Sequence, residues 1–367
     1  SLALFWARLG SLHALGSTAG GRFWKPWLGE DLCSEDTIAR VHALIEAQGL
    51  RKGLKRVYTC LKRNKALRAV EGWEGAVLDG HDTHSSYRRH CSGCLERTVH
   101  TSAGERIQYY HRHVALLLLS DKLRLLLDLE AQRPGEDEVA AALRLLERVM
   151  QTYPRAFKVV LADALYAEAR FVNFLLSQRK HVLIVLKDER RDLYRDATAL
   201  FVVQAPQAGR YRNRQCLWSD VQDLNTWPQV PAPLRVVRSE ETYFVRRQLT
   251  GNLEPQQTHW MWVTTLTQSE LSTEGVVRLG HARWDIENYG FNELVNAWHA
   301  DHVYKHDACA MENFALVAFL AYNLFHAFLT LNLKPQLRRA RTEEFWARAI
   351  AAEIYQGAAK SRAGHPP

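Results

Sequence analysis

The chain has 367 residues, 47% of them apolar, a length and composition that predict a globular protein with more than one hydrophobic core and exclude a disordered or fibrous chain. A formal net charge of +8 and a pI near 9.2 are compatible with a polyanionic partner such as nucleic acid. Six cysteines in a chain of this length do not make a disulfide scaffold and indicate a reducing cytosol.

The N-terminal residues predict no secretory signal, because no basic residue precedes the apolar residues that follow Ser1. Since the chain starts with Ser1 rather than Met, we expect a fragment or a trimmed form of a longer chain. The apolar run from Phe314 to Leu333 has about the length of a membrane span, but Asn323, His326 and Asn332 interrupt it. We therefore expect a buried core helix there.

Residues 1–70 are expected to be a helical, basic and incomplete segment that is able to bind DNA. Ser34 is a typical helix N-cap, and the apolar stripe expected after it is Ile38, Val41, Leu44 and Ile45. A second helix, with Leu54, Val57 and Leu61 on its apolar side, is expected after Gly49 and Gly53. The basic residues around it are Arg51, Lys52, Lys55, Arg56, Lys62, Arg63, Lys65 and Arg68. A solvated helix face and a contact with the DNA backbone both explain this run.

Two apolar runs that each end in an aspartate organise residues 71–188. The first leads from Gly75 into Asp79, and the second leads from Lys158 into Asp163. An aspartate at the end of a buried strand loses its hydration unless it binds a partner or a metal. Further strands are predicted over 97–101, 109–119 and 181–187, and helices over 136–153 and 166–178.

Residues 189–258 predict a β-rich insertion. Short alternating segments, such as 234–237 and 243–249, are broken by prolines and carry many arginines. Residues 259–333 are expected to return to the main sheet and then to form a helix that begins after Ser272. Residues 334–367 are expected to be a C-terminal tail, frayed beyond Arg362.

The stretch from Arg283 to Leu294 (RWDIENYGFNEL) carries the most specific motif of the chain. A helical pattern places Ile286, Phe291, Leu294 and Trp298 toward the core. Arg283 and Glu287 are four residues apart, a spacing that puts both on one face of a helix. A solvated ion pair explains this spacing, and so does a functional site.

This stretch resembles the third catalytic block of the DDE transposases of bacterial insertion sequences, in the insertion-sequence-four group. The signature of that group is Tyr, two residues, Arg, three residues, Glu, six residues and Lys. Arg283 and Glu287 match it, whereas Gly280 stands at the Tyr position and Leu294 at the Lys position. In the family these two side chains handle backbone phosphate. The candidates to replace them are Lys305, His281 and Tyr289.

The resemblance implies an α/β fold, with a ribonuclease H-like mixed sheet flanked by helices and a β-rich insertion before the last catalytic helix. In that fold the first and fourth strands each bring an Asp to one edge of the sheet, and a later helix supplies the third acid. The implied catalytic triad is therefore Asp79, Asp163 and Glu287, holding two Mg²⁺ or Mn²⁺ ions. The competing carboxylates are Asp82, Asp285 and Glu293. A strand-end cap or an ion pair also explains each acid taken singly.

The function implied by the resemblance is cut-and-paste transposition, in which metal-dependent cleavage at terminal inverted repeats is followed by strand transfer into double-stranded target DNA. A homodimer would hold two ends in a synaptic complex, in the bacterial cytoplasm at the nucleoid. In close relatives a flipped base stacks on a Trp. The residues implied in DNA binding are Arg283, Trp284, Lys305 and Trp262. The competing interpretation is a catalytically inactive, transposase-derived DNA-binding protein, which the departures at the Tyr and Lys positions favour and the three retained acids oppose.

A second group of residues, rich in His and Cys, lies between positions 81 and 113. Its members are His81, His84, His90, Cys91, Cys94, His100, His111 and His113. Cys91 and Cys94 with two of these histidines would make a structural Zn²⁺ site between the first two strands. Free cytosolic thiols and a redox pair are the alternatives. A zinc-dependent hydrolase built on this group is a third functional class, which would bind zinc tightly and would not need Glu287.

Overall fold

The computed structural model describes residues 1–356 except for 103, 188, 190, 249 and 250. The chain forms two compact units. Unit 1 contains Ser1–Arg68, Gly80–Pro154 and the residues from Ile286 onward, and unit 2 contains Ala69–Asp79 and Arg155–Asp285. Strand β1 (Gly75–Ser86) begins in unit 2 and ends in unit 1. The fraying expected beyond Arg362 lies outside the described residues.

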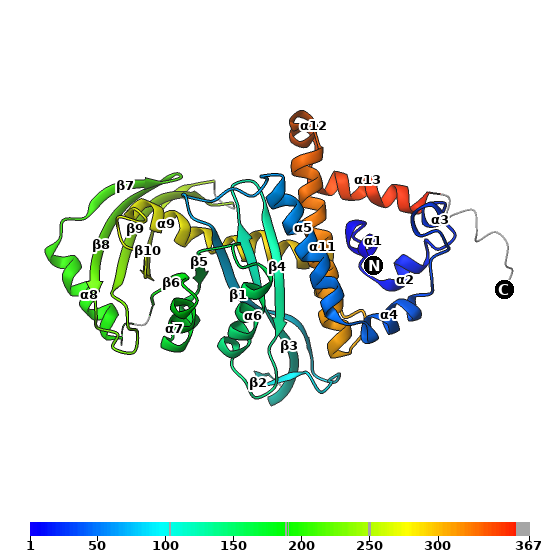
Figure 1. Ribbon diagram of the computed structural model, residues 1–367, viewed down its shortest axis with the longest axis horizontal. Coiled ribbons are helices and arrows are strands. Elements are labelled where there is room, and N and C mark those ends of the chain that lie inside the picture. Colours follow the sequence, from blue (N-terminus) through cyan, green and yellow to red (C-terminus); the bar gives the residue numbers. More distant parts are fainter. Residues whose placement is uncertain (103, 188, 190, 249–250, 357–367) are drawn as a thin grey trace. The chain divides into compact units, whose positions relative to one another are not determined.

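The strands of unit 2 follow one another in the order β1-β5-β6-β10-β9-β8-β7 (Figure 1). Those after β1 are β5 (Val159–Ala162), β6 (His181–Val185), β7 (Gln207–Tyr211), β8 (Arg214–Leu224), β9 (Leu234–Arg246) and β10 (Leu253–Thr264). β1, β5 and β6 are parallel, and the pairs from β6 through β10 to β7 are antiparallel. The predicted β-rich insertion is confirmed, and the strand expected over 243–249 belongs to β9, which ends at Arg246.

The helices of unit 2 lie between these strands. They are η1 (Ala164–Tyr166), α7 (Ala169–Ser177), α8 (Asp192–Val203) and α9 (Thr273–Ala282). α9 begins where the sequence predicts, because the Ser272 hydroxyl accepts a hydrogen bond from the Gly275 N–H at 3.1 Å. α8 precedes β7, so the insertion opens with a helix.

Unit 1 contains a strand for which the sequence pattern predicts no element. Its strands besides the end of β1 are β2 (Leu95–Thr101), β3 (Gly104–Leu119) and β4 (Arg124–Ala131), followed by helix α6 (Glu138–Thr152). The strand order β4-β3-β1-β5-β6 is that of the ribonuclease H-like fold, which confirms the predicted α/β class. The second and third strands of that fold are β3 and β4, however, and β2 is an addition paired with β3. β4 escapes prediction because its Leu, Arg and Glu residues favour helix.

The other helices of unit 1 come from both ends of the chain (Figure 1). They are α1 (Leu2–Trp6), α2 (Leu12–Gly16), α3 (Trp24–Leu28), α4 (Glu35–Leu44), α5 (Ala47–Arg63), α10 (Asn292–Trp298), α11 (Ala308–Ala327), α12 (Pro335–Ala340) and α13 (Glu343–Tyr355), with π-helical turns η2 (Ile286–Phe291) and η3 (Phe328–Asn332). The segment Ala308–Asn332 is long and apolar enough to cross a membrane, but 56% of its apolar window is buried. α11 packs against α4, α5 and β4, as expected of a core helix.

α4 and α5 differ in detail from the sequence prediction. The Ser34 hydroxyl caps α4 by accepting from the Thr37 N–H at 3.3 Å, as predicted. Ile38 is buried, but the other three residues expected in the same stripe, Val41, Leu44 and Ile45, are exposed. His42 is buried there instead, with its ring stacked on Phe314 at a centroid distance of 3.9 Å. α5 begins at Ala47, so the two glycines expected before it lie inside it.

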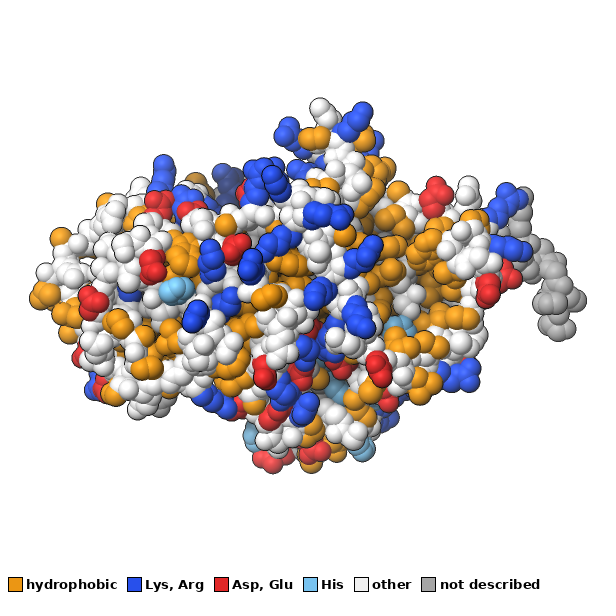
Figure 2. Space-filling view, viewed as in Figure 1, with side chains coloured by type: hydrophobic (Ala, Val, Ile, Leu, Met, Phe, Trp, Pro, Cys, Tyr) orange, Lys and Arg blue, Asp and Glu red, His pale blue; other side chains and the backbone are white. Residues whose placement is uncertain are grey.

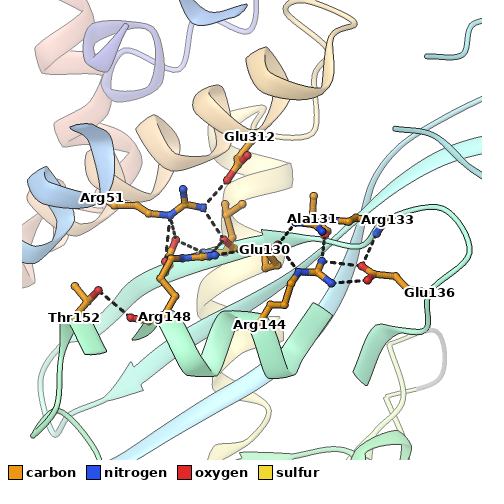
Figure 3. Close-up of polar contacts among 11 residues, drawn as sticks. Arg51, Glu130, Ala131, Arg133, Glu136, Arg144, Arg148, Thr152 and Glu312 are labelled. Carbon is orange, nitrogen blue, oxygen red and sulfur yellow. Dashed lines mark hydrogen bonds and ion pairs between the residues drawn. The ribbon is translucent and has the colours of Figure 1, made fainter. Parts of the chain in front are cut away.

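A network of ion pairs joins α5, α6 and β4 within unit 1 (Figure 3). Asp128 and Glu130 of β4 are buried carboxylates. Arg148 Nε donates to Asp128 Oδ2 at 2.7 Å, and Arg144 Nε donates to Glu130 Oε1 at 2.9 Å. Arg51 Nε donates to Asp128 Oδ1 at 2.9 Å. Arg51, one of the basic residues considered for DNA contact, therefore has an internal structural role.

Candidate active site

Two aspartates belong to neighbouring parallel strands of unit 2. Asp163 directly follows β5, as predicted, whereas Asp79 lies inside β1, because this strand continues to Ser86 and does not end at the aspartate. β1 pairs with β5 in a register that sets Val77 opposite Leu161. Asp79 and Asp163 each stand two residues beyond this pair, so we expect the same register, continued past the end of β5, to bring them level. Level residues of parallel strands point to the same face, about 4.8 Å apart. The register therefore predicts that two acids of the proposed triad are neighbours.

Asp163 also has a local structural role. Its Oδ1 accepts a hydrogen bond from the Leu165 N–H at 2.9 Å and caps η1. The alternative explanation for Asp163, a cap at the end of its strand, is therefore confirmed for Oδ1, the oxygen that accepts this hydrogen bond. A carboxylate offers two oxygens with about four lone-pair sites, so the cap is compatible with a second ligand.

Arg283 lies beside Asp79 in unit 2. Its Nη1 is 3.4 Å from Asp79 Oδ2, and the two side chains are only 7% and 15% exposed. The guanidinium also lies over the ring of Trp284, with Cζ 4.4 Å from the ring centroid. Sequence reasoning assigned Arg283 to DNA and missed this pair, because 204 residues separate the partners and no local spacing signals it.

Gly280, at the Tyr position of the family signature, packs against Trp262. A Cβ at Gly280 would lie 2.5 Å from Trp262 Cε2 and 2.6 Å from its Nε1, so the indole fills the space that a side chain would need. Trp262 is 1% exposed and its ring stacks with that of Trp260 at 6.1 Å. The expectation that Trp262 contacts DNA is therefore not matched by its position, which is in the core of unit 2.

Glu287 lies in unit 1, in the π-helical turn η2, and is half-buried. The four neighbouring positions predicted to face the core are buried, namely Ile286, Phe291, Leu294 and Trp298. The regular α-helix expected from Arg283 onward is interrupted by a turn and the π-helical segment, a feature that is frequent at functional sites. Because Glu287 and the two aspartates belong to different units, their approach to one another stays a prediction.

The competing carboxylates have partners of their own in unit 1. Asp82 pairs with Arg97 at 2.9 Å and with Arg112 at 3.2 Å. Glu293 accepts a hydrogen bond from the Trp298 indole at 3.0 Å and pairs with the imidazole of His326 at 2.9 Å. Structural roles thus account for Asp82 and Glu293. In unit 2, Asp285 is buried.

The residues considered as DNA contacts differ in exposure. Lys305 is exposed in the segment between α10 and α11 of unit 1. Trp284 is half-buried and packs edge-on against Trp260 at 6.1 Å in unit 2. His281 is buried with its Nε2 2.6 Å from Glu241 Oε1, so it is engaged inside unit 2 and does not replace a phosphate contact.

A cavity of about 620 Å³ lies beside η2 in unit 1. Tyr289, two residues after Glu287, lines it and is 45% exposed. Its basic lining residues are Lys122, Arg124, Arg338 and Arg341, and its acidic ones are Asp121, Glu293 and Glu343. The lining therefore carries a formal excess of one positive charge, with His326 taken as neutral.

Cys91 and Cys94 lie in the turn between β1 and β2 of unit 1, with Sγ atoms 3.9 Å apart. The imidazole of His111 contacts both, and burial lowers the pKa of His111 to about 4, with His306 adding to the shift. His306 also contacts Cys94, although 212 residues separate them. Sequence spacing did not connect His306 with the cysteines.

The family described as Transposase DDE domain matches residues 80–324, more than half of the chain. The matched range contains Asp163, Arg283 and Glu287, and it begins one residue after Asp79. No curated protein matches the chain. The chain belongs to the family of transposases with a DDE domain.

Proposed function

We propose that this protein is an active transposase that cleaves DNA at the terminal inverted repeats of its own element and joins the ends to target DNA. The observation that supports the proposal is the parallel register of β1 and β5, which pairs Val77 with Leu161, two residues before Asp79 and Asp163. The third proposed acid is Glu287, four residues after Arg283 as in the family signature.

The proposed triad fits a divalent metal site. Carboxylate oxygens are the ligands that Mg²⁺ and Mn²⁺ prefer, and Asp79 and Asp163, on neighbouring strands, would supply them. When bound, two such ions supply an activated water and stabilise the leaving oxygen of a phosphodiester. Arg283 orients the Asp79 carboxylate and offsets part of the repulsion between the two aspartates.

The exposed basic residues of unit 1 are the proposed DNA contacts. Apart from Arg51, all the basic residues from α5 to the start of unit 2 are exposed, namely Lys52, Lys55, Arg56, Lys62, Arg63, Lys65 and Arg68. Figure 2 shows Lys and Arg side chains gathered over this part of the molecule. With Lys305 and the cavity beside η2, they would neutralise backbone phosphates, which makes binding salt-dependent. Trp284 is the proposed platform for a flipped base, and a homodimer at the bacterial nucleoid is the proposed assembly.

The departures from the family signature are compatible with activity. The space beside Gly280 is filled by the ring of Trp262, and Leu294 is 4% exposed in the core of unit 1. Both positions therefore serve packing in this chain. The alternative function, DNA binding without catalysis, does not follow from either replacement.

A cleavage assay tests the proposal. The substrate is DNA carrying the inverted repeats that flank the gene, incubated with Mg²⁺ or Mn²⁺. We expect metal-dependent nicking at the repeat boundary by the wild type and by Asp82→Asn, whose carboxylate has ion-pair partners on the surface. Glu287→Gln and Asp163→Asn should bind the same DNA without nicking it. Binding without nicking by every variant, the wild type included, would favour the inactive DNA-binding protein.

A further inference from the structure

Four metal-ligating side chains converge in unit 1, apart from the proposed triad. They are Cys91 and Cys94 from the turn between β1 and β2, His111 from β3, and His306 from the segment between α10 and α11. One ligand atom from each lies within 4.8 Å of all the others. Cys94 and His111 are buried, and Cys91 and His306 are half-buried. The four come from three separate parts of the chain.

Four of the six distances among these ligand atoms are close to those of a tetrahedral zinc site. With Zn–S bonds of about 2.3 Å and Zn–N bonds of about 2.0 Å, a tetrahedron requires Sγ atoms about 3.8 Å apart and S···N distances of about 3.5 Å. The Sγ atoms of Cys91 and Cys94 are 3.9 Å apart. His111 Nε2 lies 3.3 Å from Cys91 Sγ and 3.2 Å from Cys94 Sγ, and His306 Nε2 lies 3.6 Å from Cys94 Sγ.

The turn that carries the cysteines is shaped around this cluster. The Cys91 N–H donates to Cys94 Sγ at 3.2 Å, so one sulfur has backbone support. A Cβ at Gly93 would lie 3.4 Å from His111 Cε1 and 3.2 Å from Ala308 Cβ, so glycine permits the close approach of the turn to the imidazole. A dithiol without a metal would not require two imidazole nitrogens next to its sulfurs.

We propose that Cys91, Cys94, His111 and His306 bind a structural Zn²⁺ ion. Four protein ligands complete a tetrahedron and leave no position for water or substrate, which separates this site from a catalytic zinc. The ion would tie the segment between α10 and α11 to the β1–β2 turn and β3. The ion would also hold the backbone at Lys305, the neighbour of His306, in place. Only this consequence rests on the proposed function, in which Lys305 contacts DNA.

Metal analysis of the purified full-length chain tests the proposal without reference to DNA cleavage. We expect about one zinc ion per wild-type chain after dialysis, and tetrahedral thiolate and imidazole bands in the visible spectrum when Co²⁺ replaces it. Cys94→Ser and His306→Gln should lose most of the bound metal. Cys309→Ser, an exposed cysteine three residues from His306, and Glu287→Gln should keep it.

Several outcomes would overturn the proposal. They are a wild-type chain that holds no zinc after growth in zinc-supplemented medium, zinc retained by His306→Gln, or a Co²⁺ spectrum of octahedral type. A mass lower by two hydrogen atoms, located to a disulfide between Cys91 and Cys94 under non-reducing conditions, would assign a redox pair instead. Should Cys94→Ser fail to fold, the metal content and Co²⁺ spectrum of the wild type and of His306→Gln still decide the question.

Discussion

Replacing Gly280 by alanine tests whether packing determines the residue at the Tyr position of the family signature. The added Cβ would lie 2.5 Å from Trp262 Cε2 and 2.9 Å from Cδ2, whereas carbon atoms pack at about 3.5–4.0 Å. The ring would have to move by roughly 1 Å, and it is 1% exposed. Forcing such a movement in a packed core costs about 1–3 kcal/mol of unfolding free energy.

Gly49→Ala is the matched control for this substitution. Gly49 lies in the first turn of α5, and a Cβ there would meet no atom within 4 Å. Both changes replace a helical glycine by alanine, a change that by itself stabilises by about 0.5–1 kcal/mol. The difference between the two variants therefore isolates the steric cost, about 1–3 kcal/mol.

Urea unfolding followed by circular dichroism measures both variants. We expect the midpoint of Gly280→Ala to fall below that of Gly49→Ala, which should lie at or above the wild type. Combining Gly280→Ala with Trp262→Phe should recover part of the loss, because the smaller ring frees space, and the coupling is read from the double-mutant cycle. Equal stability of the two glycine variants would refute the packing argument.

Three further predictions concern arginines and buried acids. Arg148→Met should lower the unfolding free energy by about 1.5–3 kcal/mol in urea melts, because Asp128 and Glu130 each lose one arginine partner and keep Arg51 and Arg144, respectively. Arg348→Met, at an exposed pair, should change it by less than about 1 kcal/mol. Burial would raise the pKa of Glu130, but hydrogen bonds from two arginines of α6 lower it below the ordinary 4.5. The stability that the Glu130 carboxylate contributes should therefore be present above pH 4.5 and lost as the pH falls below it. The urea midpoint of Glu130→Gln should then fall less steeply than that of the wild type when the pH is lowered below 4.5. Arg283→Lys should slow single-turnover nicking by about 10²-fold with DNA binding retained, because the ion pair that orients Asp79 is altered. Arg278→Lys, at an exposed arginine, should not slow nicking. Equal nicking rates for the two variants would contradict a role of the Arg283–Asp79 ion pair in catalysis.

Features with a local signature were predictable from the sequence. Continuous apolar runs predicted β1, β5 and β6, and the aspartate after two of them predicted where the candidate acids stand. Ser34 and Ser272 cap the helices that they were expected to begin. These features depend on the hydrophobic period and on hydrogen bonds over three or four residues, so neighbouring residues contain the information.

The remaining features depend on residues far apart in the chain. The approach of Arg283 to Asp79, across 204 residues, and of His306 to Cys94, across 212, has no local spacing to predict it. Burial of Trp262 against Gly280 likewise depends on how α9 packs in unit 2. The sequence by itself determined the fold class, the aspartate at the end of β5 and the helix caps, whereas it predicted the end of β1 too early. Only the tertiary structure decided which charged, aromatic and metal-ligating side chains meet, because folding brings distant segments together while local pattern specifies only which face of a segment is buried.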